Sequence, residues 1–295
     1  FAYNQEEYIR EAVEGALAQT YEPLEIILSD DCSSDRTFEI MQEMAEAYQG
    51  PHKLHVRRSV ENRGLLGDIN DVVVQSSGDI LVLGAGDDVS FAGRTSRLVR
   101  VFQMRPSVYA VYSEHELINA LETKKKNWVS SIELIPIEEV AFNGGGVGKG
   151  ATYAYRRKCF LWPQALPENL FSEDRILPLR ATLLGEVAFL PESHVLYRVR
   201  EEGMGRVLKR SGALSLSLEP HIRLLCQEIS HARSENLITK QLALSCTSVI
   251  RIRHFLSNGS VKGGGFSRRI RGVLNRILLR VLKITTPQRS IVKLH

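Results

Sequence analysis

Two pairs of adjacent aspartates stand out in the first third of the chain, because each pair comes shortly after an apolar run. The pairs are Asp30-Asp31 and Asp87-Asp88. Carboxylate oxygens are the ligands that Mg²⁺ and similar hard cations prefer, usually together with waters and substrate phosphates. A single pair is explained more simply as a turn, because Asp favours turns. Two such pairs, each at the end of an apolar run, favour a cation site that binds a diphosphate.

A third acidic cluster, Glu173-Asp174, follows Ser172 in the second half of the chain. Taken alone it is typical of a helix start, because Ser caps helices and acidic residues in the first turn complement the helix dipole. Its position after the two aspartate pairs suggests a second interpretation, as a carboxylate that takes a proton from a substrate. The chemistry then depends on whether the fold brings the three clusters together.

The elements that would position these clusters alternate between strands and helices. Asn4 and either Ser33 or Ser34 are expected to cap the first two helices. Such alternation predicts an α/β fold with a mostly parallel sheet flanked by helices, in which ligands bind beyond the carboxyl ends of the strands. Apolar periodicity predicts strands at residues 25–29, 54–56, 79–83, 108–113, 152–156, 186–190 and 194–199, and helices at 8–17, 38–48, 65–73, 94–104, from 172 onward and over 214–256.

A glycine-rich segment separates the second aspartate pair from the third acidic cluster. Residues 143–150 read Asn-Gly-Gly-Gly-Val-Gly-Lys-Gly and are expected to form a mobile loop. A Walker-type phosphate loop needs Gly six positions before its Lys and Ser or Thr directly after it. Asn143 and Gly150 occupy these positions around Lys149. The pattern fails at both, which excludes an ATPase of this type.

The composition is that of an ordinary globular protein. The 295 residues are 43% hydrophobic and 24% charged, which excludes a disordered or fibrous chain. The four cysteines are far apart and predict neither a zinc site nor a disulfide framework, which favours a reducing compartment such as the cytoplasm. No apolar run in the sequence approaches the roughly 20 residues that a membrane-spanning helix needs.

The end of the chain is strongly basic: residues 262–295 hold nine basic residues and no acidic one. Within residues 266–284 apolar side chains recur at steps of three and four, between basic ones. This pattern is typical of a helix that lies on an anionic membrane surface. A helix packed on the rest of the protein is the alternative. Nucleic-acid binding is less favoured because the stripe is aliphatic, so we expect no nucleic-acid partner.

The ordered set of motifs resembles that of the family 2 glycosyltransferases, which have the GT-A fold. The resemblance implies a nucleotide-diphospho-sugar transferase domain with a Rossmann-like sheet over residues 1–205. The helical pattern that follows predicts a helical extension over 206–261, before the basic tail over 262–295. The resemblance also implies an inverting transfer of a sugar from a nucleotide donor, expected to carry UDP, to a hydroxyl acceptor. Four blocks carry it: residues 3–9 with 19–21 and 25–37, residues 61–65 with Asn70, residues 78–89, and residues 172–174.

The resemblance further implies a role for each matching residue. Asp174 would be the general base that deprotonates the acceptor, and Glu173 would orient it. Asp87 and Asp88 would hold Mg²⁺ or Mn²⁺ on the diphosphate. The donor nucleotide would be bound by Tyr3, Asn4, Asp30, Asp31, Asn62 and Arg63, with Arg198 and Arg200 reaching its diphosphate from a closing segment.

The family resemblance also implies a biosynthetic pathway and a cellular location. We expect a role in bacterial polysaccharide, lipopolysaccharide or glycolipid synthesis, with a saccharide or lipid-linked acceptor. The expected location is cytoplasmic, at the inner face of the cell membrane, to which residues 266–284 would attach the protein peripherally.

Three departures from the family pattern keep other interpretations open. Ala85 stands where the metal motif usually begins with Asp, and Arg200 stands where a His is frequent. The strand that usually precedes Tyr3-Asn4 is not in the sequence, from which we expect a missing N-terminal segment. A catalytically degenerate, nucleotide-binding scaffold subunit is therefore one alternative. A nucleotidyltransferase is another, although residues 1–12 contain no glycine-rich basic loop.

Overall fold

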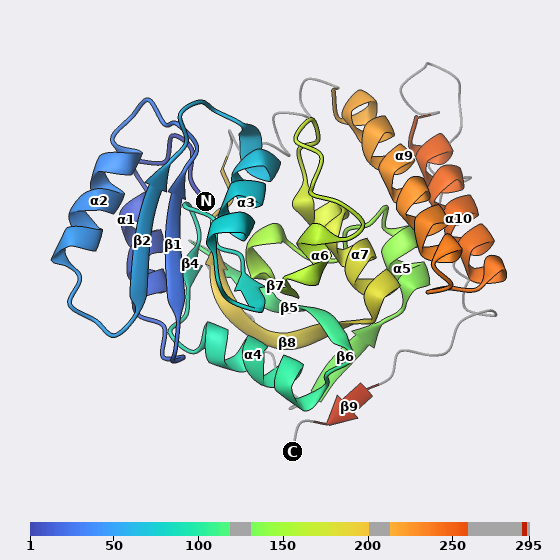
Figure 1. Cartoon of the computed structure of the whole chain (residues 1–295), viewed down its shortest axis with the longest axis horizontal. Helices are drawn as coiled ribbons and strands as arrows, with labels where there is room; N and C mark the ends of the chain where they lie inside the picture. Colours follow the sequence, from blue (N-terminus) through green and yellow to red (C-terminus); the bar gives the residue numbers. More distant parts are fainter. Residues whose placement is uncertain (119–130, 201–212, 259–290, 294–295) are drawn as a thin grey trace.

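The strands that precede the two aspartate pairs belong to different sheets. The computed structural model describes residues 1–118, 131–200, 213–258 and 291–293 (Figure 1). In it, β1 (Glu25–Asp30) pairs in parallel with β2 (Lys53–Arg58) to form a two-stranded sheet. The larger sheet has the order β3-β7-β5-β8-β6-β9, with β4 beside β8. Its strands are β3 (Ile80–Val82), β4 (Val89–Ser90), β5 (Val108–Leu117), β6 (Ser131–Ile135), β7 (Tyr153–Arg156), β8 (Glu186–Tyr197) and β9 (Ile291–Lys293).

The helices cover these sheets from both sides (Figure 1). Helices α1 and α2 lie beside β1 and β2, α4 lies under the large sheet, and α3, α6, α7 and α5 lie above it. Helices α9 and α10 form a pair at the far end from α2. The bounds are α1 (Ile9–Leu17), α2 (Thr37–Ala47), α3 (Gly64–Gln75), α4 (Arg94–Met104), α5 (Ile137–Phe142), α6 (Lys158–Leu161), α7 (Leu177–Leu184), α9 (Ala213–Ser234) and α10 (Lys240–Asn258), with short 3₁₀ helices η1 (Gly150–Thr152) and η2 (Glu173–Arg175).

The expected α/β class is confirmed, but the large sheet is mixed rather than mostly parallel. β5 and β8 pair in parallel, whereas β3 pairs antiparallel with β7, and β6 pairs antiparallel with both β8 and β9. The prediction of a parallel sheet came from the strand–helix alternation of the first 115 residues. Strands β6, β7 and β9 come from later in the chain, where that alternation does not hold.

Several predicted element boundaries are wrong for local reasons. Ser33 and Ser34 do not cap α2, which begins at Thr37, and the carboxylate of Asp35 accepts the Thr37 amide at 2.9 Å instead. Asn4 does not cap α1, whose N-cap is Tyr8. The two strands expected over 186–199 form the single strand β8, and the helical region after residue 213 divides into α9 and α10. The helix expected to open at residue 172 is preceded by η2.

A cavity of about 550 Å³ lies between β1 and β3. Residues 1 and 2 lie at its edge and connect the two sheets. The amide of Ala2 donates to the Ser29 carbonyl at 2.9 Å, and its carbonyl accepts the Asp31 amide at 2.9 Å. On the other side, the carbonyl of Phe1 accepts the Gly86 amide at 2.9 Å. These bonds bring the residues that carry the two aspartate pairs to the same end of the sheets.

The helical extension shares its core with the rest of the protein. Leu225 and Ile229 of α9 are buried in one apolar cluster with Tyr155 of β7 and Leu179 of α7. In the described part of the chain, no helix combines the length and the apolar character needed to cross a bilayer. The basic stripe over residues 266–284 lies outside the described residues, whereas residues 291–293 of the basic tail form β9 at the edge of the sheet.

Candidate active site

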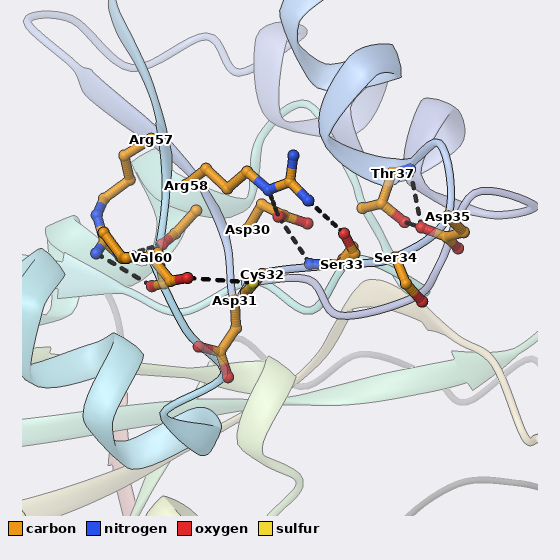
Figure 2. Close-up of polar contacts among 12 residues, drawn as sticks. Asp30, Asp31, Cys32, Ser33, Ser34, Asp35, Thr37, Arg57, Arg58 and Val60 are labelled. Atoms are coloured by element: carbon orange, nitrogen blue, oxygen red, sulfur yellow. Dashed lines mark hydrogen bonds and ion pairs between the residues drawn. The ribbon is translucent and has the colours of Figure 1, made fainter.

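Asp30 lies at the carboxyl end of β1 and is completely buried (Figure 2). Its Oδ2 accepts the Ser33 amide at 3.0 Å and lies 3.4 Å from Nε of Arg58. Arg58 is the register partner of Asp30 on β2, donates to the Ser33 carbonyl at 2.5 Å and stacks on the ring of Phe38. Among the described residues, Oδ1 of Asp30 has no hydrogen-bond partner. This oxygen is a buried acceptor that can receive an N–H group of a ligand.

Asp31 points away from Asp30 and contacts the start of α3 (Figure 2). Its Oδ1 accepts the Arg63 amide at 2.9 Å. Burial raises the pKa of Asp31, and the nearby Asp68 carboxylate adds to this, whereas the Arg63 amide opposes it. Asp31 therefore fixes the loop that follows β2 relative to the end of β1.

The other residues expected at the nucleotide have structural contacts of their own. Asn62 accepts the Gly64 amide at 3.1 Å, at the start of α3. The guanidinium of Arg63 bonds Asp71 at 2.6 Å and also pairs with Glu168. Asn4, at a φ of 50°, accepts the Ser34 amide at 2.8 Å, and its own amide donates to Ser33. Tyr3 next to it is half-exposed. Tyr3 and Asn4 thus lie beside the loop after Asp30, whereas the side chain of Arg63 is directed to the loop before η2.

The second aspartate pair lies against the end of β8, because β4 pairs antiparallel with that strand. The Arg198 amide donates to Oδ1 of Asp88 at 2.7 Å, and Arg198 Nε donates to the Asp87 carbonyl at 3.0 Å. Arg200 Nη1 lies 3.3 Å from Oδ2 of Asp87. Both guanidinium groups lie over the ring of Tyr8, at 4.6 Å for Arg198 and 4.9 Å for Arg200. The structure therefore brings together the predicted metal ligands and the predicted diphosphate-binding arginines.

Arg94 connects the second aspartate pair to the third acidic cluster. It is buried at the start of α4 and donates to the carbonyl of Leu83 at 2.8 Å and to that of Ala151 at 2.5 Å. Burial lowers the pKa of Arg94 to about 10, and the charge of Asp88 opposes this shift. Gly150, next to Ala151, packs directly against the carboxyl group of Glu173. Arg94 thus interacts with Asp88 through its charge and with η1 through a hydrogen bond, and η1 in turn lies against Glu173.

Glu173 and Asp174 lie next to each other in η2 in different environments. Glu173 is buried, and its burial, followed by the negative charge of Asp174, raises the pKa of Glu173 to about 8. Asp174 is only partly buried, and its Oδ1 accepts a hydrogen bond from the Ser172 hydroxyl. At neutral pH the pair therefore combines a largely protonated carboxyl group with a partly exposed, oriented carboxylate.

The pKa of Glu173 predicts a pH dependence of stability. Between about pH 5 and pH 8 the folded protein holds a proton on Glu173 that the unfolded chain has released. The free energy of unfolding should therefore fall as the pH rises through this range, by at most about 1.4 kcal/mol per pH unit for one group. Urea unfolding at several pH values measures how steeply the free energy of unfolding changes with pH. Glu173→Gln should reduce the slope and leave the part that the raised pKa of Asp88 contributes below about pH 7, and an equal slope in both proteins would contradict the assignment.

Asp87 and Asp88 suit a hard divalent cation by their chemistry. Among the described residues, each carboxylate has one oxygen bonded to an arginine and a second oxygen that accepts no hydrogen bond. Burial and the adjacent Asp87 raise the pKa of Asp88 to about 7, and a bound cation would favour its charged form. No group of three or more acidic, His or Cys side chains suited to a metal occurs in the described ranges. A cation here would therefore complete its coordination with waters and substrate oxygens.

Sequence reasoning missed Arg58, Arg94 and Tyr8. Arg58 could have been found from the parallel register of β1 and β2, which places it beside Asp30. Arg94 had no comparable signal, because its contacts with Leu83 and Ala151 depend on tertiary structure. Tyr8 falls at the start of the helix expected over residues 8–17, and nothing in that pattern indicates that its ring supports two arginines.

Comparison with known proteins agrees with this arrangement. Residues 1–160 match the family model described as Glycosyl transferase family 2. An uncharacterized protein of Mycobacterium tuberculosis is 29% identical over 205 residues, which are 69% of this chain and 58% of that protein. The chain thus spans little more than half the length of this relative.

Two solved structures show the same fold at low sequence identity. S. aureus TarS 1–349 in complex with UDP-GlcNAc has a TM-score of 0.68 at 20% identity, covering 89% of this chain and 74% of that TarS chain. The mannosyltransferase PcManGT of Pyrobaculum calidifontis, in complex with GDP-Man and Mn²⁺, has a TM-score of 0.59 at 17% identity, covering 94% and 78%. The chain therefore belongs to glycosyl transferase family 2 and has the GT-A fold.

Proposed function

We propose that the protein is an inverting glycosyltransferase that moves a sugar from a nucleotide-diphosphate donor to a hydroxyl group of an acceptor. The observation that supports it most directly is the position of Arg94, which interacts with Asp88 through its charge and donates to the Ala151 carbonyl of η1, where Gly150 lies against Glu173. This arrangement supports a site in which a diphosphate and its cation would lie near the Asp174 carboxylate.

The donor would be bound by residues from both sheets. The buried Oδ1 of Asp30 would accept an N–H group of the base, and the N3–H of uracil is such a group, which supports UDP as the nucleotide. Asp87 and Asp88 would hold Mg²⁺ or Mn²⁺, which offsets the charge that develops on the departing diphosphate. Arg198 and Arg200 would contact its oxygens, held near it by the ring of Tyr8.

Asp174 would act as the general base. Ser172 engages Oδ1, so Oδ2 is the atom that would take the proton of the acceptor hydroxyl. The hydroxyl oxygen forms a bond to the anomeric carbon as the bond from that carbon to the phosphate oxygen breaks, and the nucleoside diphosphate leaves. One carboxylate facing the anomeric carbon suits a single displacement with inversion. Glu173, buried behind it, would hold the turn in place.

The proposal also covers the substrates and the cellular location of the reaction. TarS and PcManGT bind nucleotide sugars, which supports a nucleotide-sugar donor here but identifies no acceptor. We propose a saccharide or lipid-linked acceptor in bacterial envelope synthesis. We also propose peripheral attachment to the inner face of the membrane through residues 266–284, which lie outside the described residues.

A donor panel tests the proposed function. The protein is incubated with UDP-glucose, UDP-GlcNAc, UDP-galactose and GDP-mannose in the presence of Mn²⁺, and the release of nucleoside diphosphate is followed. We expect release from a UDP-sugar, its loss on addition of EDTA, and its recovery with excess Mn²⁺.

The same assay separates the alternatives. A nucleotidyltransferase would release or consume pyrophosphate instead of forming a nucleoside diphosphate. UDP binding by calorimetry without turnover of any donor would favour the scaffold subunit. Release that is unchanged by EDTA would contradict the proposed role of Asp87 and Asp88.

A further inference from the structure

The glycine-rich segment (residues 143–150) has no role in the proposed reaction, yet it contacts the turn that carries both catalytic carboxylates. It follows α5, where Gly144 and Gly145 have positive φ values of 64° and 94°. The Gly145 amide donates to the Val140 carbonyl at 2.9 Å, which ends the helix with a backbone hydrogen bond. The segment, expected to be a mobile loop, is therefore anchored to a helix end and packs on η2.

Glycine is required in this segment because of how closely it approaches η2. A Cβ atom at Gly145 would lie 1.7 Å from the carbonyl oxygen of Arg175, and one at Gly146 would lie 3.1 Å from that of Asp174. A Cβ atom at Gly150 would lie 2.0 Å from Oε1 of Glu173. Backbone can approach backbone and a buried carboxyl group this closely only where side chains are absent.

The segment is also held on its other sides. Its helix α5 packs against α7, which follows η2, and against α10 of the helical extension. At its other end, Lys149 lies 5.6 Å from the ring centroid of Tyr197, and the next residues form η1, whose Ala151 carbonyl accepts from Arg94. The segment therefore joins α5, which packs on α7 and α10, to the elements beside Asp88.

We propose that the glycine-rich segment is the positioning element of the catalytic turn: it keeps Glu173 in its buried place and fixes the direction in which η2 presents the Asp174 carboxylate. This rests on the proposed function, in which Asp174 is the base. Gly145 and Gly150 act through η2 and are positioning residues rather than catalytic ones.

Three glycine variants test the proposal. Gly150→Ala is the most informative, because its Cβ atom meets the far end of the Glu173 side chain, so Glu173 moves while the backbone can stay in place. Gly145→Ala meets backbone and requires a positive φ, so it would shift η2 itself and also reduce stability. Gly93→Ala is the matched control, because a Cβ atom there meets nothing within 4 Å.

We expect Gly150→Ala to lower kcat for nucleoside diphosphate release by about tenfold or more, because small displacements of a reacting group are costly. The KM for the donor and the Kd for UDP should stay close to those of the wild type. Gly93→Ala should match the wild type in all three. Wild-type kcat in Gly150→Ala, or a loss of UDP binding in proportion to the loss of activity, would overturn the proposal.

A second measurement tests the contact without turnover. Glu173 faces Asp174 on its own turn and Tyr155 on β7, and Gly150 covers its carboxyl group. Gly150→Ala should therefore reduce the fall of stability between pH 5 and 8, as Glu173→Gln does. If the wild type releases no nucleoside diphosphate from any donor, the proposed function fails. An unchanged slope in Gly150→Ala would instead overturn the positioning contact.

Discussion

Replacement of Asp174 by Asn should lower kcat for nucleoside diphosphate release by about 10²- to 10⁴-fold, the range by which general bases accelerate reactions. Asn has nearly the same size as Asp and can still accept the Ser172 hydroxyl through its amide oxygen. It cannot take a proton from the acceptor. UDP binding should be unchanged, because Asp30 and the aspartate pair at 87–88 are untouched. Steady-state kinetics and calorimetry measure the two effects separately.

Asp79→Asn is the control for this variant, because Asp79 is exposed at the start of β3 and loses the same charge. It should retain wild-type kcat. A wild-type rate in Asp174→Asn would place the base at another residue. A parallel loss of UDP binding and activity would mean that the substitution disturbs the fold rather than the chemistry.

The largest effect on stability is expected from Glu228→Gln, at about 3–5 kcal/mol, because it leaves a buried charge without its partner. Arg180 of α7 is fully buried, and its Nε and Nη2 lie 2.8 and 2.7 Å from Oε1 of Glu228 on α9. Burial raises the pKa of Glu228, and the guanidinium of Arg180 opposes this shift. The midpoint of urea unfolding and the dependence of the unfolding free energy on urea concentration together measure the loss of stability.

Helix α9 also provides the control for Glu228→Gln. Arg223 pairs with Glu219 on the surface of the same helix at 3.1 Å, and its side chain is 74% exposed. Arg223→Gln should change the midpoint little, because exposed pairs contribute little to stability. The double variant Arg180→Met, Glu228→Leu should recover much of the loss, because it removes both charges. An unchanged midpoint in Glu228→Gln would show that the pair does not hold α9 in place.

Elements with a clear local period were predictable from the sequence. Helix α4 has the bounds expected from its apolar spacing, and β1 extends the expected strand by one residue to Asp30. The neighbours of each strand were not predictable, because pairing depends on contacts between distant residues. Asp88 meets the Arg198 amide 110 residues away, and nothing in either local pattern encodes that contact.

Residue type and the family resemblance selected the residues of the candidate site, whose roles stay predictions. Asp30, Asp87 and Asp174 could be selected because carboxylates after apolar runs and at helix starts have few other uses in combination. The role of the glycine-rich segment could not be predicted. It depends on the close approach of these glycines to η2, and the sequence does not show which residues lie next to them. For Arg63 the motif predicts a contact with the donor nucleotide. In the structure, however, its guanidinium pairs with Asp71 and Glu168. Its role at the donor stays a prediction.

The contacts around Tyr8 have a consequence for the electrostatics of substrate entry. In the structure the guanidinium of Arg200 pairs with the Asp87 carboxylate and that of Arg198 pairs with Glu11, whereas Asp88 accepts the backbone amide of Arg198. Each of these two guanidinium groups is balanced by one carboxylate, so the two ion pairs have little net charge. A diphosphate that arrives with a divalent cation is also close to neutral. Donor binding would then be an exchange of ion partners at constant total charge, with the aromatic ring keeping both arginines within reach throughout.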